Sequence, residues 1–253
     1  MDANHAAASH ERIPEETLLD RFNRYFEAVP ALTESDIQKS QRIRFQVYCV
    51  ENPFENPADH PDGLERDVFD AHSVHSILIH RASGETMGTT RLIMPVPGAL
   101  QGSFAIQQVC DHPTLNRLPL HRMAEVSRFS ISKQFRRRKV DTLYEGFDTT
   151  GGQRSVAPLM SLGLIQSLVR MSAEYEITHW CATMEPTLLR LLQPMGIYFE
   201  PLGPLVQYHG LRQPCYCEVA AMLQRVKDQQ RAMWEILTDG GVLLPKQLDH
   251  LPH

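Results

Sequence analysis

The chain has 253 residues, of which 42% are hydrophobic and 22% charged, a balance typical of a soluble globular protein with one sizeable core. Its net charge of −5 gives no bulk attraction for nucleic acid or for an anionic membrane, so any basic partner site has to be local. No apolar stretch approaches the roughly 20 residues of a membrane span, and the polar residues 1–16 lack the apolar core of a secretion signal, so we expect a cytoplasmic protein.

In the N-terminal half, apolar residues at helical spacing predict helices, and runs of β-branched residues predict strands. Clusters of Pro, Asn and Gly predict loops. These patterns give a disordered N-terminus at 1–16, helices at 14–28 and 35–51, a loop at 52–63, and strands at 74–80 and 86–94 that pair as an antiparallel hairpin around Ser83-Gly84.

The C-terminal half alternates strands with helices. We expect an irregular segment at 95–116, a strand at 123–132 and a polar loop or insertion at 133–155. A helix that begins near Ser155, a strand at 177–184 and a short helix at 187–195 ended by Gly196 follow. Closing strands are expected at 205–209 and 215–219, and a last helix at 219–236. This order describes an α/β (α+β) sandwich with one domain at 17–240 and a tail at 241–253.

Charged residues gather in three clusters. Glu65, Asp67 and Asp70 follow the loop directly, Arg91 lies in the second hairpin strand within Gly-Thr-Thr-Arg-Leu, and the next strand reads Ala-Glu-Val-Ser-Arg-Phe at residues 124–129. Acids and arginines inside otherwise apolar strands are costly to bury unless they are paired. The three acids could alternatively form a solvated loop, which is the commoner fate of a charge run.

The order of these clusters carries a resemblance to a known family. Arg44 followed by Tyr48, then Glu65-x-Asp67-x-x-Asp70, Arg91 and Glu125-x-Ser127-Arg128 resembles the signature of the acyl-homoserine-lactone synthases of the GNAT superfamily. Additional strings resemble the acyltransferases associated with exosortase and PEP-CTERM sorting systems, relatives of the N-acyl amino acid synthases: Val47–Glu51, Pro61-Asp62-Gly63, Met184-Glu185, Gly203-Pro204 and Tyr208-His209-Gly210.

The resemblance covers roughly residues 40–220. It implies a GNAT-like fold with a mixed central sheet flanked by helices. It also implies an N-acyltransferase that moves a long acyl chain from acyl carrier protein, or from acyl-CoA, to the amine of an amino acid or similar small acceptor, with no bound cofactor. The alternatives are an acyl-homoserine-lactone synthase that uses S-adenosylmethionine, and a catalytically silent module that binds acyl chains or the carrier protein.

Two departures from the family pattern bear on the substrates. Asn52-Pro53-Phe54 stands where the lactone synthases have a tryptophan, which disfavours S-adenosylmethionine as the amino donor. The glycine-rich turn that binds acetyl-CoA in the wider superfamily is missing, and a long polar insertion stands there instead. This second departure favours a pantetheine arm presented on a protein.

Glu125 is the first candidate for the general base, because an amine must lose a proton before it attacks a thioester. A carboxylate with a raised pKa can take that proton. The alternative is a salt bridge from Glu125 to Arg128 or Arg91. Strand alternation places Glu125 and Ser127 on one face and Arg128 on the other. A β-bulge, for which the superfamily is known, would bring Arg128 together with Glu125 and free a backbone N–H for the carbonyl oxygen.

Arg91 has two possible roles. It could bind the carboxylate of the acceptor bidentately, or it could join Arg44 in a buried ionic lattice with Glu65, Asp67 and Asp70. By resemblance the three acids line the acceptor pocket. The resemblance also assigns substrate-binding roles to Arg44, Tyr48 and Ser127 and catalytic roles to Arg91 and Arg128.

A basic run offers a local partner site. It comprises Arg136, Arg137, Arg138 and Lys139, and it would dock an acidic acyl carrier protein or else form a solvated loop. A nucleic-acid site is not expected, because the run lacks interleaved aromatic residues and belongs to an acidic protein. No two of the five cysteines have Cys-x-x-Cys spacing, so we expect reduced thiols and no metal site.

Overall fold

The structure is a computed structural model that describes residues 16–136 and 157–244. Its strands are β1 (Phe26–Pro30), β2 (Ser73–His80), β3 (Thr86–Ile93), β4 (Met123–Ile131), β5 (His179–Met184), β6 (Glu200–Pro201), β7 (Val206–Gln207) and β8 (Leu211–Glu218). Its α-helices are α1 (Leu18–Tyr25), α2 (Glu34–Phe45), α3 (Pro113–Arg117), α4 (Lys133–Arg136), α5 (Ala157–Glu174), α6 (Pro186–Leu192), α7 (Val219–Gln229) and α8 (Arg231–Thr238). Short segments are the π-helical η1 (Gln46–Glu51) and the 3₁₀ turns η2 (Pro57–Asp59), η3 (Val68–His72), η4 (Ala105–Gln108), η5 (Leu120–Arg122) and η7 (Gln193–Met195).

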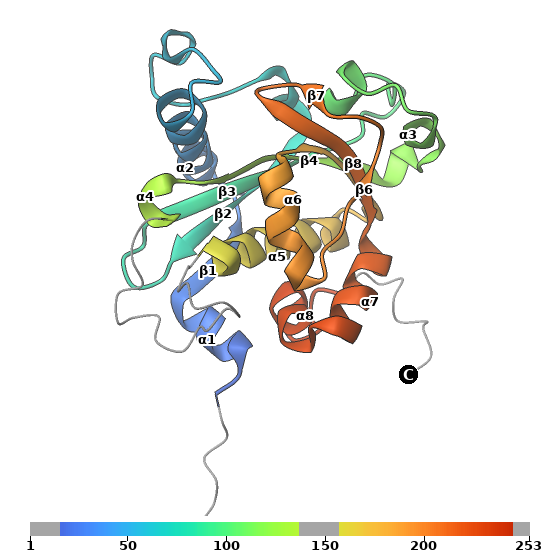
Figure 1. Ribbon diagram of the computed structural model, residues 1–253. Helices are drawn as coiled ribbons and strands as arrows, with labels where there is room; N and C mark the ends of the chain where they lie inside the picture. The colour runs from blue at the N-terminus through green and yellow to red at the C-terminus, as the bar shows by residue number, and fades with distance from the viewer. Residues whose placement is uncertain (1–15, 137–156, 245–253) are drawn as a thin grey trace, which may run out of the picture.

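The strands form a mixed sheet in the order β1-β2-β3-β4-β5-β8-β6, with β7 paired to β8. Among the described strands, β4 and β5 run parallel and the other neighbours antiparallel. Helices cover both faces, with α2 above the sheet and α5 below it in the view of Figure 1. Neighbouring residues of β3 show this alternation, since Thr89 bonds to Ser40 of α2 and Gly88 faces Leu164 of α5. The predicted α/β class with a mixed sheet flanked by helices is confirmed.

The main hydrophobic core lies between the sheet and α5. Because α5 carries apolar residues on nearly all sides, it is buried along most of its length, and α8 packs against its far side. Trp180 of β5 is fully buried in this core and donates its indole N–H to Ser172. In the described parts of the chain, no helix combines the length and the apolar character that crossing a bilayer demands.

Two predicted helices differ from the structure. The helix predicted at 14–28 ends at Tyr25, and Phe26–Pro30 pairs with β2 as an edge strand. Phe22 lies in α1 and Phe26 in β1, and both are buried in the core. Their spacing of four residues therefore did not distinguish one long helix from a helix followed by a strand. The helix predicted at 219–236 breaks at Gln230, whose ψ of 63° lies outside the helical region. The break lets Trp234 and Ile236 reach the core.

Other predictions agree with the structure. The hairpin of β2 and β3, the strand β4, the strand β5 and the short helix that ends before Gly196 all occur near their predicted positions. Gly196 has φ +80°, a left-handed conformation that favours glycine at a helix end. Most of the polar insertion predicted at 133–155, and the N-cap predicted at Ser155, lie outside the described residues.

Strand β4 separates from β5 and carries a bulge just beyond that point. Thr89 of β3 pairs with Ser130, whereas Arg91 pairs with Ser127, so β4 has one residue more than β3 over this stretch. Arg128 lies within the bulge and has φ +50°, an uncommon conformation for a residue with a side chain. Strand β5 pairs with β4 at Met123–Val126 only, and the two strands diverge beyond Val126. The predicted bulge is therefore present at Arg128.

We predict that Gly88→Ala destabilises the protein by about 1–3 kcal/mol, because the new methyl group would lie 2.8 Å from the backbone oxygen of Ser130. Gly163→Ala in α5 is the matched control. Its methyl group would meet the far end of the flexible Leu78 side chain at 2.7 Å and the Phe22 ring at 3.1 Å, and not backbone. Alanine also favours a helix over glycine. Urea unfolding of both variants tests this difference, and equal losses would contradict the close approach of β3 to β4.

Candidate active site

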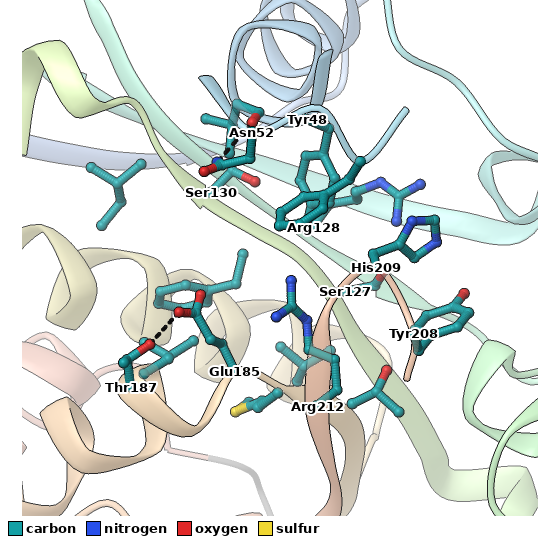
Figure 2. Close-up of a pocket in the computed structure, with 18 of the residues that line it drawn as sticks. Tyr48, Asn52, Ser127, Arg128, Ser130, Glu185, Thr187, Tyr208, His209 and Arg212 are labelled. Atoms are coloured by element: carbon teal, nitrogen blue, oxygen red, sulfur yellow. Dashed lines mark hydrogen bonds between the residues drawn. The ribbon is translucent and has the colours of Figure 1, made fainter. Parts of the chain in front are cut away.

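A cavity of about 280 Å³ opens where β4 and β5 separate. Its walls come from residues 127–131 of β4, the ends of β5 and α6, the π-helical segment η1 and the turn between β7 and β8. Polar groups gather at one end, where Figure 2 shows Tyr48, Arg128, His209 and Tyr208 around Ser127. Apolar side chains line other parts of the walls, among them Phe129, Ile131, Met184, Leu188 and Leu191.

Behind the polar end, three arginines and three acids form a buried lattice of ion pairs. Arg44 of α2 is fully buried; it bonds to Glu65 and makes a bidentate pair with Asp70 at 2.7 and 3.0 Å. Arg91 of β3 makes a bidentate pair with Asp67 at 2.6 and 2.8 Å. The segment that carries the acids is therefore bound to both α2 and the sheet, and it is not a solvated loop.

The bulge residue Arg128 completes the lattice. Its guanidinium bonds to Glu65 at 2.8 Å and approaches Asp67 at 2.9 Å. The ring of Tyr48 lies under this guanidinium at 4.7 Å from the ring centroid. Tyr48 belongs to the π-helical segment η1, a kind of distortion that occurs frequently at functional sites. The lattice thus joins the acidic segment, α2, β3 and the bulge of β4.

The lattice determines the charge state of its acids. Burial alone would raise the pKa of Glu65, but the hydrogen bond and charge of Arg128, together with Arg44, lower it to about 2. Burial would also raise the pKa of Asp70, which the Arg44 guanidinium holds well below its usual range. Burial also opposes ionisation of Asp67, but the hydrogen bond and charge of Arg91 lower its pKa. The three carboxylates stay ionised at neutral pH and balance the three guanidinium groups.

Arg91 is committed to the lattice. Its Nη1 donates to both Asp67 and Asp70, and its Nη2 donates to Asp67 and to the Ser127 hydroxyl at 3.0 Å. Both terminal nitrogens are therefore fully used by the protein itself. Of the two roles considered for Arg91, the ionic lattice is the one that the geometry shows, and Arg91 offers no free bidentate face to an acceptor carboxylate.

Glu125 lies apart from this lattice, at the inner wall of the cavity. One of its carboxylate oxygens accepts the backbone N–H of Ile106 at 2.9 Å. Among the described residues, no arginine comes within ion-pair distance of Glu125, so the alternative of a salt bridge to Arg91 or Arg128 is not formed. The reason is geometric, because both guanidinium groups turn toward the acidic segment. Burial raises the pKa of Glu125 to about 7.

Sequence reasoning missed several polar residues in and beside the cavity. Glu55 is not part of the cavity lining, but it lies 3.5 Å from Nδ1 of His209 and 3.7 Å from Arg128, which do line the cavity. Tyr208 and Arg212 line the cavity from the β7–β8 hairpin. The string Tyr208-His209-Gly210 supports a family resemblance, but its local pattern does not show that a distant hairpin folds over β4. His209 lies in the turn of this hairpin, lines the cavity and has φ +48°, an uncommon conformation for a residue with a side chain.

The basic run is only partly described. Arg136 is the last residue of α4, and residues 137–139 lie outside the described residues. Docking of a carrier protein by Arg136, Arg137, Arg138 and Lys139 therefore stays a prediction. Just before the run, Glu51 accepts the hydroxyl of Ser132 at 2.6 Å and the backbone N–H of Lys133 at 2.9 Å. These bonds fix the end of β4 against η1.

Comparisons with known proteins agree with this fold. The sequence model described as an acetyltransferase (GNAT) domain matches residues 43–145, which include the last residues of α2, the acidic segment, the hairpin and β4. A search among curated proteins gave no match.

Solved structures with a similar fold include two CoA-dependent acyl-homoserine lactone synthases. BjaI, with S-adenosylmethionine and isopentyl-CoA, has a TM-score of 0.54 at 17% identity, over 85% of this chain and 88% of that chain. MesI has a TM-score of 0.53 at 16% identity, over 82% and 94%. TofI, in a ternary complex with an inhibitor and MTA, has a TM-score of 0.57 at 17% identity, over 83% and 99%.

At this level of identity, the solved structures show a shared fold and do not identify a substrate. The chain has the GNAT-like acyltransferase fold, and the domain match together with this fold supports an N-acyltransferase of the GNAT type.

We predict that Arg44→Met lowers the free energy of unfolding by about 3–5 kcal/mol, because it leaves Glu65 and Asp70 buried with one cation too few. Lys39→Met is the matched control, since Lys39 pairs with Asp36 on the surface of the same helix and exposed pairs contribute little. Urea unfolding measures both variants. A loss for Arg44→Met no larger than the loss for Lys39→Met would contradict a stabilising lattice.

Proposed function

We propose that the protein transfers an acyl group from a thioester, carried by acyl carrier protein or by CoA, to the amine of an amino acid or similar small acceptor. The observation that supports this most strongly is Glu125. It is a buried carboxylate with a pKa near 7, it is free of ion pairs among the described residues, and it lines the cavity where β4 and β5 part. A carboxylate with such a pKa can take a proton from an ammonium group at neutral pH.

The proposed reaction is a direct transfer. Glu125 removes a proton from the acceptor ammonium, and the neutral amine attacks the thioester carbonyl carbon. A C–N bond forms, the C–S bond breaks, and the thiolate leaves as a thiol after it gains a proton. The proton that Glu125 has taken can pass to the thiolate, which regenerates the carboxylate. Tyr208 lines the cavity with its phenol protonated, because burial raises its pKa, so its O–H can donate a hydrogen bond to the leaving sulfur. Neither a nucleophilic serine nor a nucleophilic cysteine is needed.

The separation of the strands gives the thioester a place to bind. Beyond Val126, β5 no longer pairs with β4, so backbone N–H groups of β4 that face this gap are available to a carbonyl oxygen. Such donors stabilise the oxyanion that develops during acyl transfer. Apolar residues from β4 and α6, including Ile131 and Leu188, offer a surface for the acyl chain. A carrier protein as the donor would use the basic run at 136–139.

A second candidate is acyl-homoserine-lactone synthesis from S-adenosylmethionine. It is favoured by the sequence signature and by the fold shared with BjaI, whose structure contains S-adenosylmethionine. It is disfavoured by Asn52-Pro53-Phe54, since Asn52 and Phe54 line the cavity near Tyr48 and no tryptophan is there. The link to exosortase systems and the cytoplasmic location rest on the sequence alone and stay predictions.

We expect N-acyl amino acids when the purified protein is incubated with long-chain acyl carrier protein or acyl-CoA and a mixture of amino acids. Mass spectrometry detects the products, and parallel reactions with S-adenosylmethionine are examined for methylthioadenosine and an acyl lactone. Products from amino acids without methylthioadenosine support the first candidate. Methylthioadenosine release supports the second, and an acyl-protein complex with an intact thioester after hours would identify a silent binding module.

We predict that Glu125→Gln lowers kcat/KM by about 10²- to 10⁴-fold, the usual contribution of a general base. The wild-type kcat/KM should rise about tenfold per pH unit below pH 7 and level off above it, because Glu125 must be ionised to accept a proton. Glu200→Gln, on the exposed edge strand β6, serves as the control. If Glu125→Gln retains the wild-type rate and pH profile, the catalytic assignment is wrong.

A stability measurement separates catalysis from folding. Because folding raises the pKa of Glu125 from about 4.5 to about 7, the unfolded chain loses this proton more readily. The contribution of this group to stability is therefore full at low pH and declines as the pH rises through this window. Glu125→Gln removes that decline, so we expect it to be at least as stable as the wild type at pH 8. A variant that is inactive and also strongly destabilised at pH 8 would point to a structural role.

A further inference from the structure

The guanidinium groups around the cavity are not equivalent. Arg44, Arg91 and Arg128 are each nine-tenths or more buried and are engaged by Glu65, Asp67 and Asp70. Their charges are balanced within the protein, so an anionic substrate gains little from them. Any charge-based recognition of an anion in this cavity has to come from another cation.

Arg212 is such a cation. It lies on β8, it lines the cavity, and in Figure 2 its guanidinium points into the cavity. Within residues 16–136 and 157–244, no carboxylate lies within 4 Å of it, and its one side-chain hydrogen bond goes to the adjacent Leu211 carbonyl at 3.3 Å. Glu185 also lines the cavity, but its carboxylate instead accepts the hydroxyl of Thr187 at 2.5 Å.

The position of Arg212 is supported by packing. Its guanidinium lies over the ring of Phe54, 5.3 Å from the ring centroid, and the side chain is half-buried. Stacking on an aromatic face leaves the N–H edge of a guanidinium free and reduces the entropy lost when it binds a planar anion. Phe54 belongs to the Asn52-Pro53-Phe54 segment, which departs from the family pattern, so a residue specific to this chain packs against Arg212.

The acceptor is the substrate whose anionic group best fits the position of Arg212. Arg212 belongs to the same hairpin as Tyr208, and both residues line the same cavity as Glu125. An α-amino acid carries an ammonium group for Glu125 and, one carbon away, a carboxylate that guanidinium binds bidentately.

We propose that Arg212 binds the carboxylate of the acceptor, so that the enzyme selects α-amino acids over simple amines. The proposal rests on the proposed N-acyltransferase function and specifies its substrate class. Arg212 would then be a specificity-determining residue that contacts the substrate but takes no part in proton transfer.

The experiment compares Arg212→Gln and Arg212→Lys with the wild type, with the best acceptor amino acid from the transfer assay and its carboxamide as substrates. We expect Arg212→Gln to raise KM for the amino acid by roughly 10- to 100-fold, with little change in kcat, in KM for the carboxamide or in KM for the acyl donor. Arg212→Lys should recover part of the loss. Arg225→Gln is the matched control, because Arg225 stacks on Tyr198 at 5.2 Å outside the cavity.

Two kinetic outcomes would overturn the assignment. An increase in KM for the donor alone would mean that Arg212 binds a phosphate of CoA or of the carrier's pantetheine arm. Equal losses with the amino acid and its carboxamide would mean that Arg212 maintains the shape of the cavity. Thermal unfolding of each variant shows whether such a loss comes from folding.

Calorimetric titration with L-leucine and L-leucinamide makes the test independent of turnover. If the wild type forms no N-acyl product but binds L-leucine more tightly than L-leucinamide, and Arg212→Gln removes the difference, the proposed function fails and the carboxylate site stands. If the wild type forms N-acyl amino acids and Arg212→Gln keeps the preference for the free carboxylate, the function stands and the role of Arg212 is overturned.

Discussion

The lattice of three arginines and three acids is the interaction on which the site depends. A buried charge without a partner is costly, whereas a buried charge with full hydrogen bonding is tolerated. Arg44 from α2, Arg91 from β3 and Arg128 from β4 each need the acids of one short segment, and that segment needs all three arginines. Removing one member leaves the opposite charge buried, so the lattice fixes these elements relative to one another.

The same lattice explains why the cavity opens where it does. Arg128 can reach Glu65 from the bulge of β4, in a backbone conformation that a residue with a side chain seldom adopts. The bulge coincides with the point at which β4 and β5 part. The energy of the ion pairs therefore supports a local distortion, and the cavity opens beside this distortion, between two strands that would otherwise pair.

The buried carboxylates Glu65 and Glu125 have pKa values shifted in opposite directions, because only Glu65 is paired with arginines. Glu65 receives hydrogen bonds from two guanidinium groups, and its pKa falls to about 2. Glu125 receives backbone N–H groups, and burial raises its pKa to about 7. The arginines turn away from Glu125 toward the acidic segment, so one acid becomes a fixed charge and the other can exchange a proton. Arg212, which lines the same cavity as Glu125, adds a cation that the lattice does not neutralise.

The sequence by itself determined the α/β class, most of the element order, the β2–β3 hairpin and the charged clusters, because hydrophobic periodicity and charge placement are local properties. From the sequence, the acids at 65–70 could form a solvated loop or pair with arginines far away in the chain. Only the tertiary structure decided that Arg44 and Arg91 bind them. Tertiary contact also decided that Phe26–Pro30 is a strand, since its partner β2 lies some 50 residues away. It alone brought Tyr208, His209 and Arg212 to the cavity, because the fold of a distant hairpin over β4 leaves no mark in the local pattern.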